Sequence, residues 1–86
     1  MDFIWDTEKN EINKVKHHIS FEAAAFVFAD SYRIIREDII HSIDEYRYIT
    51  IGRVENDILY VAYTERGDAT RLISARRATP KERRKY

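Results

Sequence analysis

The sequence predicts an α+β domain in which an antiparallel β-sheet of three to four strands packs against two N-terminal helices, with a short C-terminal helix. Three observations predict this class. Before residue 30, helix-capping residues are followed by apolar residues at helical spacing. After residue 45, three segments are rich in β-branched and aromatic residues, and a capping box lies near the C-terminus. The 86 residues, 44% of them hydrophobic, suffice for one core and are too few for two. We expect residues 1–86 to form a single domain.

The N-terminal segment predicts a strand followed by an amphipathic helix. Residues 2–5 alternate weakly, which predicts an edge strand or an extended lead-in whose aromatic side chains reach the core. Asp6 can cap a helix that runs to His17, since a short carboxylate accepts hydrogen bonds from the first free amides. Apolar residues at helical spacing predict the inward face of this mostly exposed helix: Ile12, Val15 and Ile19.

A second helix is predicted at Phe21–Ala29, after a cap at Ser20. This segment is apolar on almost every side, so we expect burial on more than one side. Its main apolar stripe contains Phe21, Ala24, Ala25 and Phe28. Ile34 and Ile35 then predict a short strand, and the polar residues 37–45 predict a loop.

The sheet is predicted mainly from residues 46–76. Segments 46–54 and 58–64 are rich in β-branched and aromatic residues and predict a hairpin, and a turn at 66–68 leads to a third strand at 70–76. Alternation along the third strand predicts one face with Arg71, Ile73, Ala75 and Arg77 and the opposite face with Leu72, Ser74 and Arg76. Thr79, Pro80 and Glu82 then predict a capped final helix.

Several classes of function are excluded by the residues that the chain lacks. No cysteine is present, which excludes disulfides, thiolate zinc sites and a cysteine nucleophile, and favours the reducing cytoplasm. The two glycines are isolated, so no glycine-rich phosphate loop exists, and no glycine elbow surrounds a serine. His17 and His18 are adjacent and point about 100° apart on a helix, which predicts no metal site. The N-terminus lacks a signal-peptide pattern and no apolar run reaches about 18 residues, so we expect neither export nor membrane insertion.

The charge is divided between the two ends of the chain, although the net charge is zero. Residues 1–57 carry seven Lys or Arg and twelve Asp or Glu, a net −5, whereas residues 58–86 carry eight and three, a net +5. Arginine suits phosphate because its planar fork bonds two oxygens at once. Tyrosines of the predicted strands could stack unpaired bases: Tyr46, Tyr48, Tyr60 and Tyr63. The alternative is that the tyrosines pack within the sheet and the arginines are solvated surface.

Metal-free RNA cleavage needs a base for the 2′-hydroxyl, a cation for the phosphate and an acid for the leaving oxygen. Glu65, His17 and the arginines could supply these roles. Each has a structural alternative: Glu65 as an exposed turn residue, and His17 as a residue that interacts with the dipole at a helix C-terminus.

Several short motifs together resemble the BrnT family of bacterial type II toxins. The N-terminal half contributes Phe3-Ile4-Trp5-Asp6 with Lys9, Asn13 and Lys16-His17, then Ser20-Phe21-Glu22-Ala23-Ala24 and Phe28-Ala29-Asp30. The C-terminal half contributes Arg47-Tyr48-Ile49-Thr50-Ile51-Gly52, Thr64-Glu65-Arg66-Gly67-Asp68, Arg71-Leu72-Ile73-Ser74-Ala75-Arg76 and Lys81-Glu82-Arg83-Arg84-Lys85-Tyr86. One position departs from the pattern: the family usually has glycine where this chain has His18, which affects the helix end if that residue is left-handed.

The resemblance implies a RelE-like endoribonuclease that inhibits translation and that a cognate BrnA-like ribbon-helix-helix antitoxin holds inactive. DNA would be met only through that antitoxin, and no cofactor is implied. The expected catalytic residues are His17, Glu65, Arg66 and Arg76. The expected RNA- and phosphate-binding residues are Lys16, Arg47, Arg71, Arg77, Arg83 and Arg84. The alternative function is a non-catalytic basic module that docks an acidic partner or the antitoxin.

Overall fold

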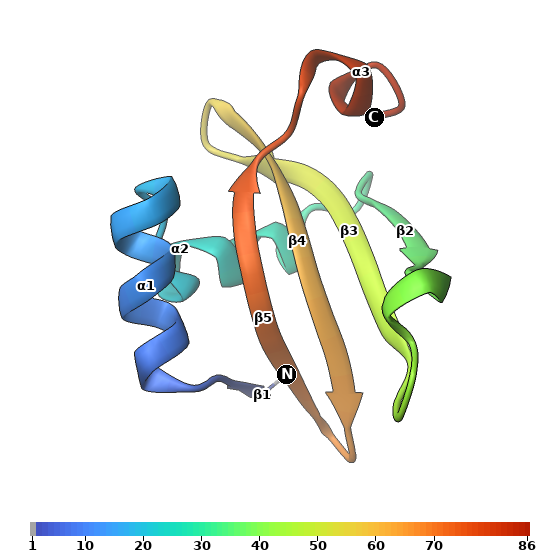
Figure 1. Cartoon of the computed structure of the whole chain (residues 1–86). Coiled ribbons are helices and arrows are strands. Elements are labelled where there is room, and N and C mark those ends of the chain that lie inside the picture. Colours follow the sequence, from blue (N-terminus) through green and yellow to red (C-terminus); the bar gives the residue numbers. More distant parts are fainter. Residues whose placement is uncertain (1) are drawn as a thin grey trace.

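The computed structural model describes residues 2–86 and confirms the α+β class (Figure 1). Its strands are β1 (Asp2–Ile4), β2 (Ile34–Glu37), β3 (Arg47–Val54), β4 (Asp57–Arg66) and β5 (Ala69–Arg77). Its α-helices are α1 (Thr7–His17), α2 (Phe21–Ala24) and α3 (Pro80–Arg83), and its 3-10 turns are η1 (Ala25–Ala29) and η2 (Ile39–His41). The strands form one sheet in the order β1-β5-β4-β3-β2.

The sheet has five strands rather than three to four, and it is mixed. The predicted β3–β4–β5 meander is antiparallel, and the short strand β2 adds to the edge of β3. The predicted N-terminal edge strand forms as β1, which pairs in parallel with β5, Phe3 opposite Thr70. Local alternation predicts that such a strand exists, but its partner and direction are decided by contacts across the whole chain.

The helix α1 has the predicted cap but not the predicted inward face. The Asp6 side chain accepts hydrogen bonds from the amides of the first turn, and Ile19, just past the helix, is buried as expected. However, Ile12 and Val15 are 55% and 79% exposed, whereas Asn10 and Asn13 are buried. The helix ends at His18, whose φ of 60° confirms the left-handed conformation in which glycine is favoured.

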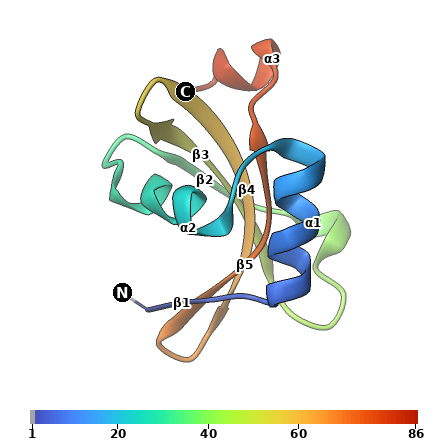
Figure 2. The ribbon, with the colours of Figure 1, turned by 90° about the vertical axis from the view of Figure 1, so that its left-hand side faces the viewer.

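Asn13 explains why a polar side chain faces inward. Its Nδ2 donates to the carbonyl of Ala75 at 2.9 Å, and the Ala75 amide donates to its Oδ1 at 3.1 Å. The strand β1 pairs with β5 only as far as Arg71. The backbone N–H and C=O groups on the edge of β5 beyond that point therefore need another hydrogen-bond partner. The Asn13 amide supplies that partner, and α1 lies along this edge in Figures 1 and 2.

The predicted second helix is correct only in its first turn. After α2 the chain tightens into η1, and the buried side chains recur every third residue, at Phe21, Ala24 and Val27. That spacing matches a 3-10 helix, which has three residues per turn. Ala25 and Phe28 are only half-buried and Phe26 is 68% exposed, so the expected burial on more than one side is wrong.

The two faces of the sheet differ. One face packs against α2 and η1 through a core that contains Phe21, Val27, Leu59, Val61 and Leu72. A smaller cluster of Ile49, Ile51, Ala62 and Ala78 includes the apolar floor of the opposite face. Figure 2 shows α2 on one side of the sheet, and Figure 1 shows no helix in front of the middle of β3, β4 and β5 on the other side. The face opposite α2 is called the open face below.

Candidate active site

Arginines on the open face lie in three rows that run across the strands. Each row consists of residues that lie opposite one another in the register of β2, β3, β4 and β5. The first row is Ile34, Ile51, Tyr60 and Arg76. The second row is Arg36, Ile49, Ala62 and Ser74. The third row is Arg47, Thr64 and Arg71. Because residues directly opposite in neighbouring strands share a face, the three rows place four arginines on one surface.

A β-bulge in β5 brings Arg71 and Arg76 to the same face. Ser74 pairs with Ala62 but Leu72 pairs with the next residue of β4, so Ile73 is an extra residue in β5. Two residues five positions apart would face opposite sides of a regular strand. The predicted separation of Arg71 from Arg76 is therefore wrong, since the bulge resets the alternation.

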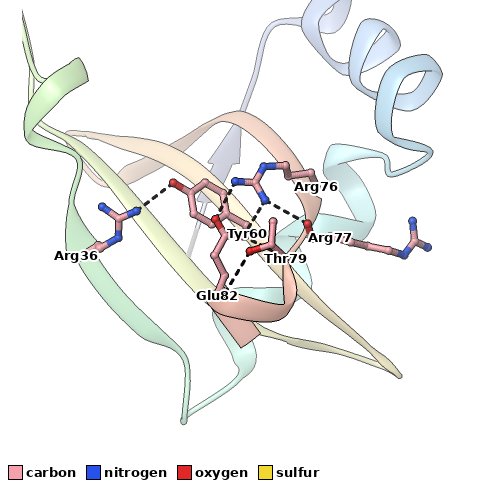
Figure 3. A network of polar contacts seen from close by, with 6 residues as sticks. All are labelled: Arg36, Tyr60, Arg76, Arg77, Thr79 and Glu82. Atoms are coloured by element: carbon pink, nitrogen blue, oxygen red, sulfur yellow. Dashed lines mark hydrogen bonds and ion pairs between the residues drawn. The ribbon is translucent and has the colours of Figure 1, made fainter. Parts of the chain in front are cut away.

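The guanidinium group of Arg76 is fixed on three sides at one end of the open face (Figure 3). Its Nη1 and Nη2 donate to the two carboxylate oxygens of Glu82 at 2.8 and 3.0 Å. Nη1 also donates to the carbonyl of Arg77, and the Cζ atom lies 3.9 Å from the centre of the Tyr60 ring. Such a cation–π contact attracts the guanidinium group to the face of the ring.

One edge of this guanidinium group is left without a partner. Of its five N–H groups, both on Nη1 and one on Nη2 are used by Glu82 and the Arg77 carbonyl. No residue among 2–86 accepts from Nε or from the second Nη2 hydrogen of Arg76. These two adjacent donors match the oxygen spacing of a phosphate or carboxylate. Arg76 therefore offers a two-point anion site on a fixed side chain.

Tyr60 connects Arg76 to a second arginine. The Nη2 of Arg36 donates to the Tyr60 hydroxyl oxygen at 3.1 Å. Since the hydroxyl accepts this hydrogen bond, its own proton is available to another acceptor. Arg36 was not predicted as a site residue, because its short strand gave no indication that β2 would lie next to β3 on this side.

Glu82 is held by the start of α3 as well as by Arg76. Thr79 caps this helix as predicted: its hydroxyl accepts from the Glu82 amide, and its own amide donates to Glu82 Oε1 at 2.8 Å. Hydrogen bonds from Arg76 and, secondarily, from Thr79 lower the pKa of Glu82 to about 2. The carboxylate is thus charged at neutral pH and cannot move without breaking the helix cap.

His17 lies at the end of α1, which runs along the edge of β5 towards the same end of the sheet as Arg76 (Figure 1). Partial burial lowers the pKa of His17, and electrostatic repulsion from Lys16, Arg76 and His18 lowers it further. At neutral pH this imidazole is neutral and can accept a proton.

A comparison with protein families identifies the chain. A family model described as the ribonuclease toxin BrnT of a type II toxin-antitoxin system matches residues 5–82. The chain belongs to the BrnT family. A search of the curated proteins finds no match. The resemblance inferred from the sequence is confirmed, and with it the function: a ribonuclease toxin, whose substrate is RNA and whose type II system supplies an antitoxin.

Two expected catalytic residues of this BrnT chain lie away from Arg76. Glu65 is five residues from Tyr60 along β4, about 17 Å, and by alternation it faces the α2 side. Its carboxylate accepts from the Thr70 hydroxyl at 3.1 Å. Arg66 pairs with Glu45 at 3.1 Å beyond the third row. The structure therefore places His17 and Arg76 towards one end of the sheet, since Asn13 of the same helix contacts Ala75, and places Glu65 and Arg66 towards the opposite end.

The expected phosphate-binding residues are also divided. Arg47 and Arg71 form the third row, and Lys16 is exposed beside His17. Arg77 faces the α2 side and pairs with Asp57 at 3.3 Å, whereas Arg83 and Arg84 are exposed at the end of α3.

Within residues 2–86 no cluster of three or more His, Asp or Glu side chains could hold a metal ion, and no helix is long and apolar enough to cross a membrane.

Proposed function

We propose that this BrnT toxin is an endoribonuclease that cleaves RNA without a metal ion, at the end of the open face formed by Arg76, Tyr60, Arg36 and His17. The observation that carries the proposal is the unpartnered Nε–Nη2 edge of Arg76, fixed between the Tyr60 ring and Glu82. A phosphodiester bound at that edge would lie next to the second cation, Arg36. Two guanidinium groups can supply the positive charge that phosphate chemistry requires.

The chemistry would be transfer of the phosphoryl group to the adjacent 2′-oxygen. Neutral His17 would accept the 2′-hydroxyl proton while that oxygen bonds to phosphorus. The bond from phosphorus to the 5′-oxygen breaks, and the Tyr60 hydroxyl would donate its proton to this leaving oxygen. Arg76 and Arg36 would stabilise the negative charge that accumulates on the non-bridging oxygens.

We also propose that the antitoxin is a BrnA-like ribbon-helix-helix protein, that the toxin meets DNA only through it, and that the system acts in the cytoplasm. The support is the family membership and a chain without cysteine. The arginine-rich open face is a suitable target for inhibition, because an acidic segment of the antitoxin placed there would block the RNA site.

The test is cleavage of total RNA by the purified toxin, with and without a chelator of divalent metals. Arg76→Gln removes the anion site, and Lys9→Gln is the control because it removes one charge from the exposed surface of α1. We expect cleavage that resists the chelator, persists in Lys9→Gln and is lost in folded Arg76→Gln. Cleavage abolished by the chelator would disprove metal independence, and RNA binding without cleavage would favour the non-catalytic module.

A further inference from the structure

The third row contains two buried polar atoms that have no hydrogen-bond partner. They are Arg47 Nε and Thr64 Oγ1, and within residues 2–86 no other buried side-chain nitrogen or oxygen lacks a partner. Arg47 and Thr64 are opposite one another in the register of β3 and β4. Thr64 is only 1% exposed. Folding rarely leaves such atoms unsatisfied, so these two adjacent atoms are candidates for hydrogen bonds to a bound ligand.

The charge around Thr64 indicates what kind of ligand this is. Arg47 lies on one side of Thr64 and Arg71 on the other, both half-buried. Neither guanidinium group has an acidic partner among the described residues, whereas Arg66, next along the sheet, pairs with Glu45. Two unpaired cations beside an unpartnered hydroxyl favour an anion, which would relieve their repulsion and accept from all three groups.

We propose that the third row, Arg47–Thr64–Arg71, is a second phosphate subsite, which binds a phosphate of the same RNA strand whose scissile phosphate binds at Arg76. Identifying the anion as an RNA phosphate rests on the proposed function. Thr64 is four residues from Tyr60 along β4, about 13 Å, and both lie on the open face. The Thr64 hydroxyl and the Arg47 and Arg71 guanidinium groups donate to the phosphate oxygens.

The residues between the two subsites fit this path. The second row has small side chains on β4 and β5, Ala62 and Ser74, so an RNA backbone could pass close to the sheet there. The bulge at Ile73 is what brings Arg71 onto this surface. A bulge next to a binding surface commonly serves to re-aim a side chain, which is the effect it has on Arg71.

The test measures RNA binding separately from cleavage. A fluorescent single-stranded oligonucleotide with 2′-O-methyl groups is used, because without a free 2′-hydroxyl it cannot be cut. Its dissociation constant is measured by anisotropy over a range of salt concentrations for the wild type, Arg71→Gln, Thr64→Val and the control Lys9→Gln. Thr64→Val keeps the shape of the buried side chain, so this variant tests the hydroxyl alone, and thermal melts confirm that every variant folds.

We expect Arg71→Gln to weaken binding several-fold at low salt and to reduce the slope of log K against log salt by about 0.7, the change for one lost phosphate contact. Thr64→Val should weaken binding with little change in slope, because the hydroxyl is uncharged, and Lys9→Gln should bind like the wild type.

Folded Arg71→Gln and Thr64→Val variants that bind like the wild type would overturn the second subsite, while cleavage that still depends on Arg76 would leave the proposed function intact. No binding by the wild type at low salt would overturn both.

Discussion

The guanidinium group of Arg76 and the carboxylate of Glu82 form a two-point ion pair that joins β5 to α3 (Figure 3). Oε1 of Glu82 also accepts from the Thr79 amide, so the acidic partner belongs to a helix cap. The pair leaves the Nε–Nη2 edge of Arg76 without a partner. We interpret Glu82 as a positioning residue that fixes the direction of the anion-binding edge.

Glu82→Gln tests this interpretation. Glutamine preserves the size of the side chain but offers Arg76 one neutral oxygen in place of a two-point carboxylate. We expect kcat to fall by roughly 10- to 100-fold, because the phosphate-binding edge is no longer held in one orientation. Single-turnover cleavage of a defined RNA measures the rate, and Glu82→Asp should recover part of it. A variant that cleaves faster than the wild type would instead show that Glu82 blocks the site.

The same ion pair predicts how stability depends on pH. The pKa of Glu82 is lowered from 4.5 in the unfolded chain to about 2 in the folded one. The stabilisation is therefore complete above pH 4.5 and is lost as the pH falls towards 2. We expect a contribution on the order of 2 kcal/mol above pH 5, after allowance for the partial solvent exposure of both side chains.

Thermal unfolding of the wild type and Glu82→Gln between pH 2 and pH 7 measures this contribution. The difference in stability between the two proteins should be constant above pH 5 and should shrink as the solution is acidified. A difference that stays the same down to pH 2 would show that the Glu82 carboxylate is not the titrating group.

The lowered pKa of His17 predicts how the rate of cleavage depends on pH. The positive charge of Lys16 helps to lower the pKa of His17, and a catalytic base acts only when it is neutral. The rate should therefore rise with pH through a midpoint below 6.5. Lys16→Gln should shift that midpoint to higher pH, since one of the charges that disfavour the imidazolium is removed, and His17→Asn should lower the rate by about 100-fold or more.

The measurement is kcat as a function of pH for these variants. Lys9→Gln again serves as the control, because Lys9 is not among the groups that shift the pKa of His17. An acidic limb that does not move in Lys16→Gln, or that survives in His17→Asn, would assign the base to another residue.

The features that the sequence predicted correctly depend on neighbours in the chain. The helix caps at Asp6, Ser20 and Thr79 are local, because the capping side chain and the amides it accepts from lie within three residues. The bulge at Ile73 is not local, since it depends on how β5 aligns with β4. The predicted separation of Arg71 from Arg76 was wrong for that reason.

The site itself was only partly predictable from the sequence. The capping box located Glu82, but no local pattern shows that the chain turns back so that this carboxylate also pairs with Arg76. Arg36 was missed because its contact with Tyr60 crosses two strand pairings. Glu65 and Arg66 were grouped with Arg76 through sequence motifs alone, and the length of β4 separates them in the structure.

Asn13 provides the last prediction, which concerns stability. Its side chain makes three buried hydrogen bonds, two with the backbone of Ala75 and one to the carbonyl of Ile19 at 2.8 Å. Asn13→Ala would leave these backbone groups unsatisfied and buried, so we expect a loss of roughly 2–4 kcal/mol in the free energy of unfolding.

The control is Ile12→Ala in the same helix, where an apolar side chain that is 55% exposed is removed. Urea denaturation should show a change of at most about 0.5 kcal/mol for this control. If Ile12→Ala proved the more damaging change, α1 would face the sheet through its apolar side, and the replacement of a strand partner by Asn13 would be refuted.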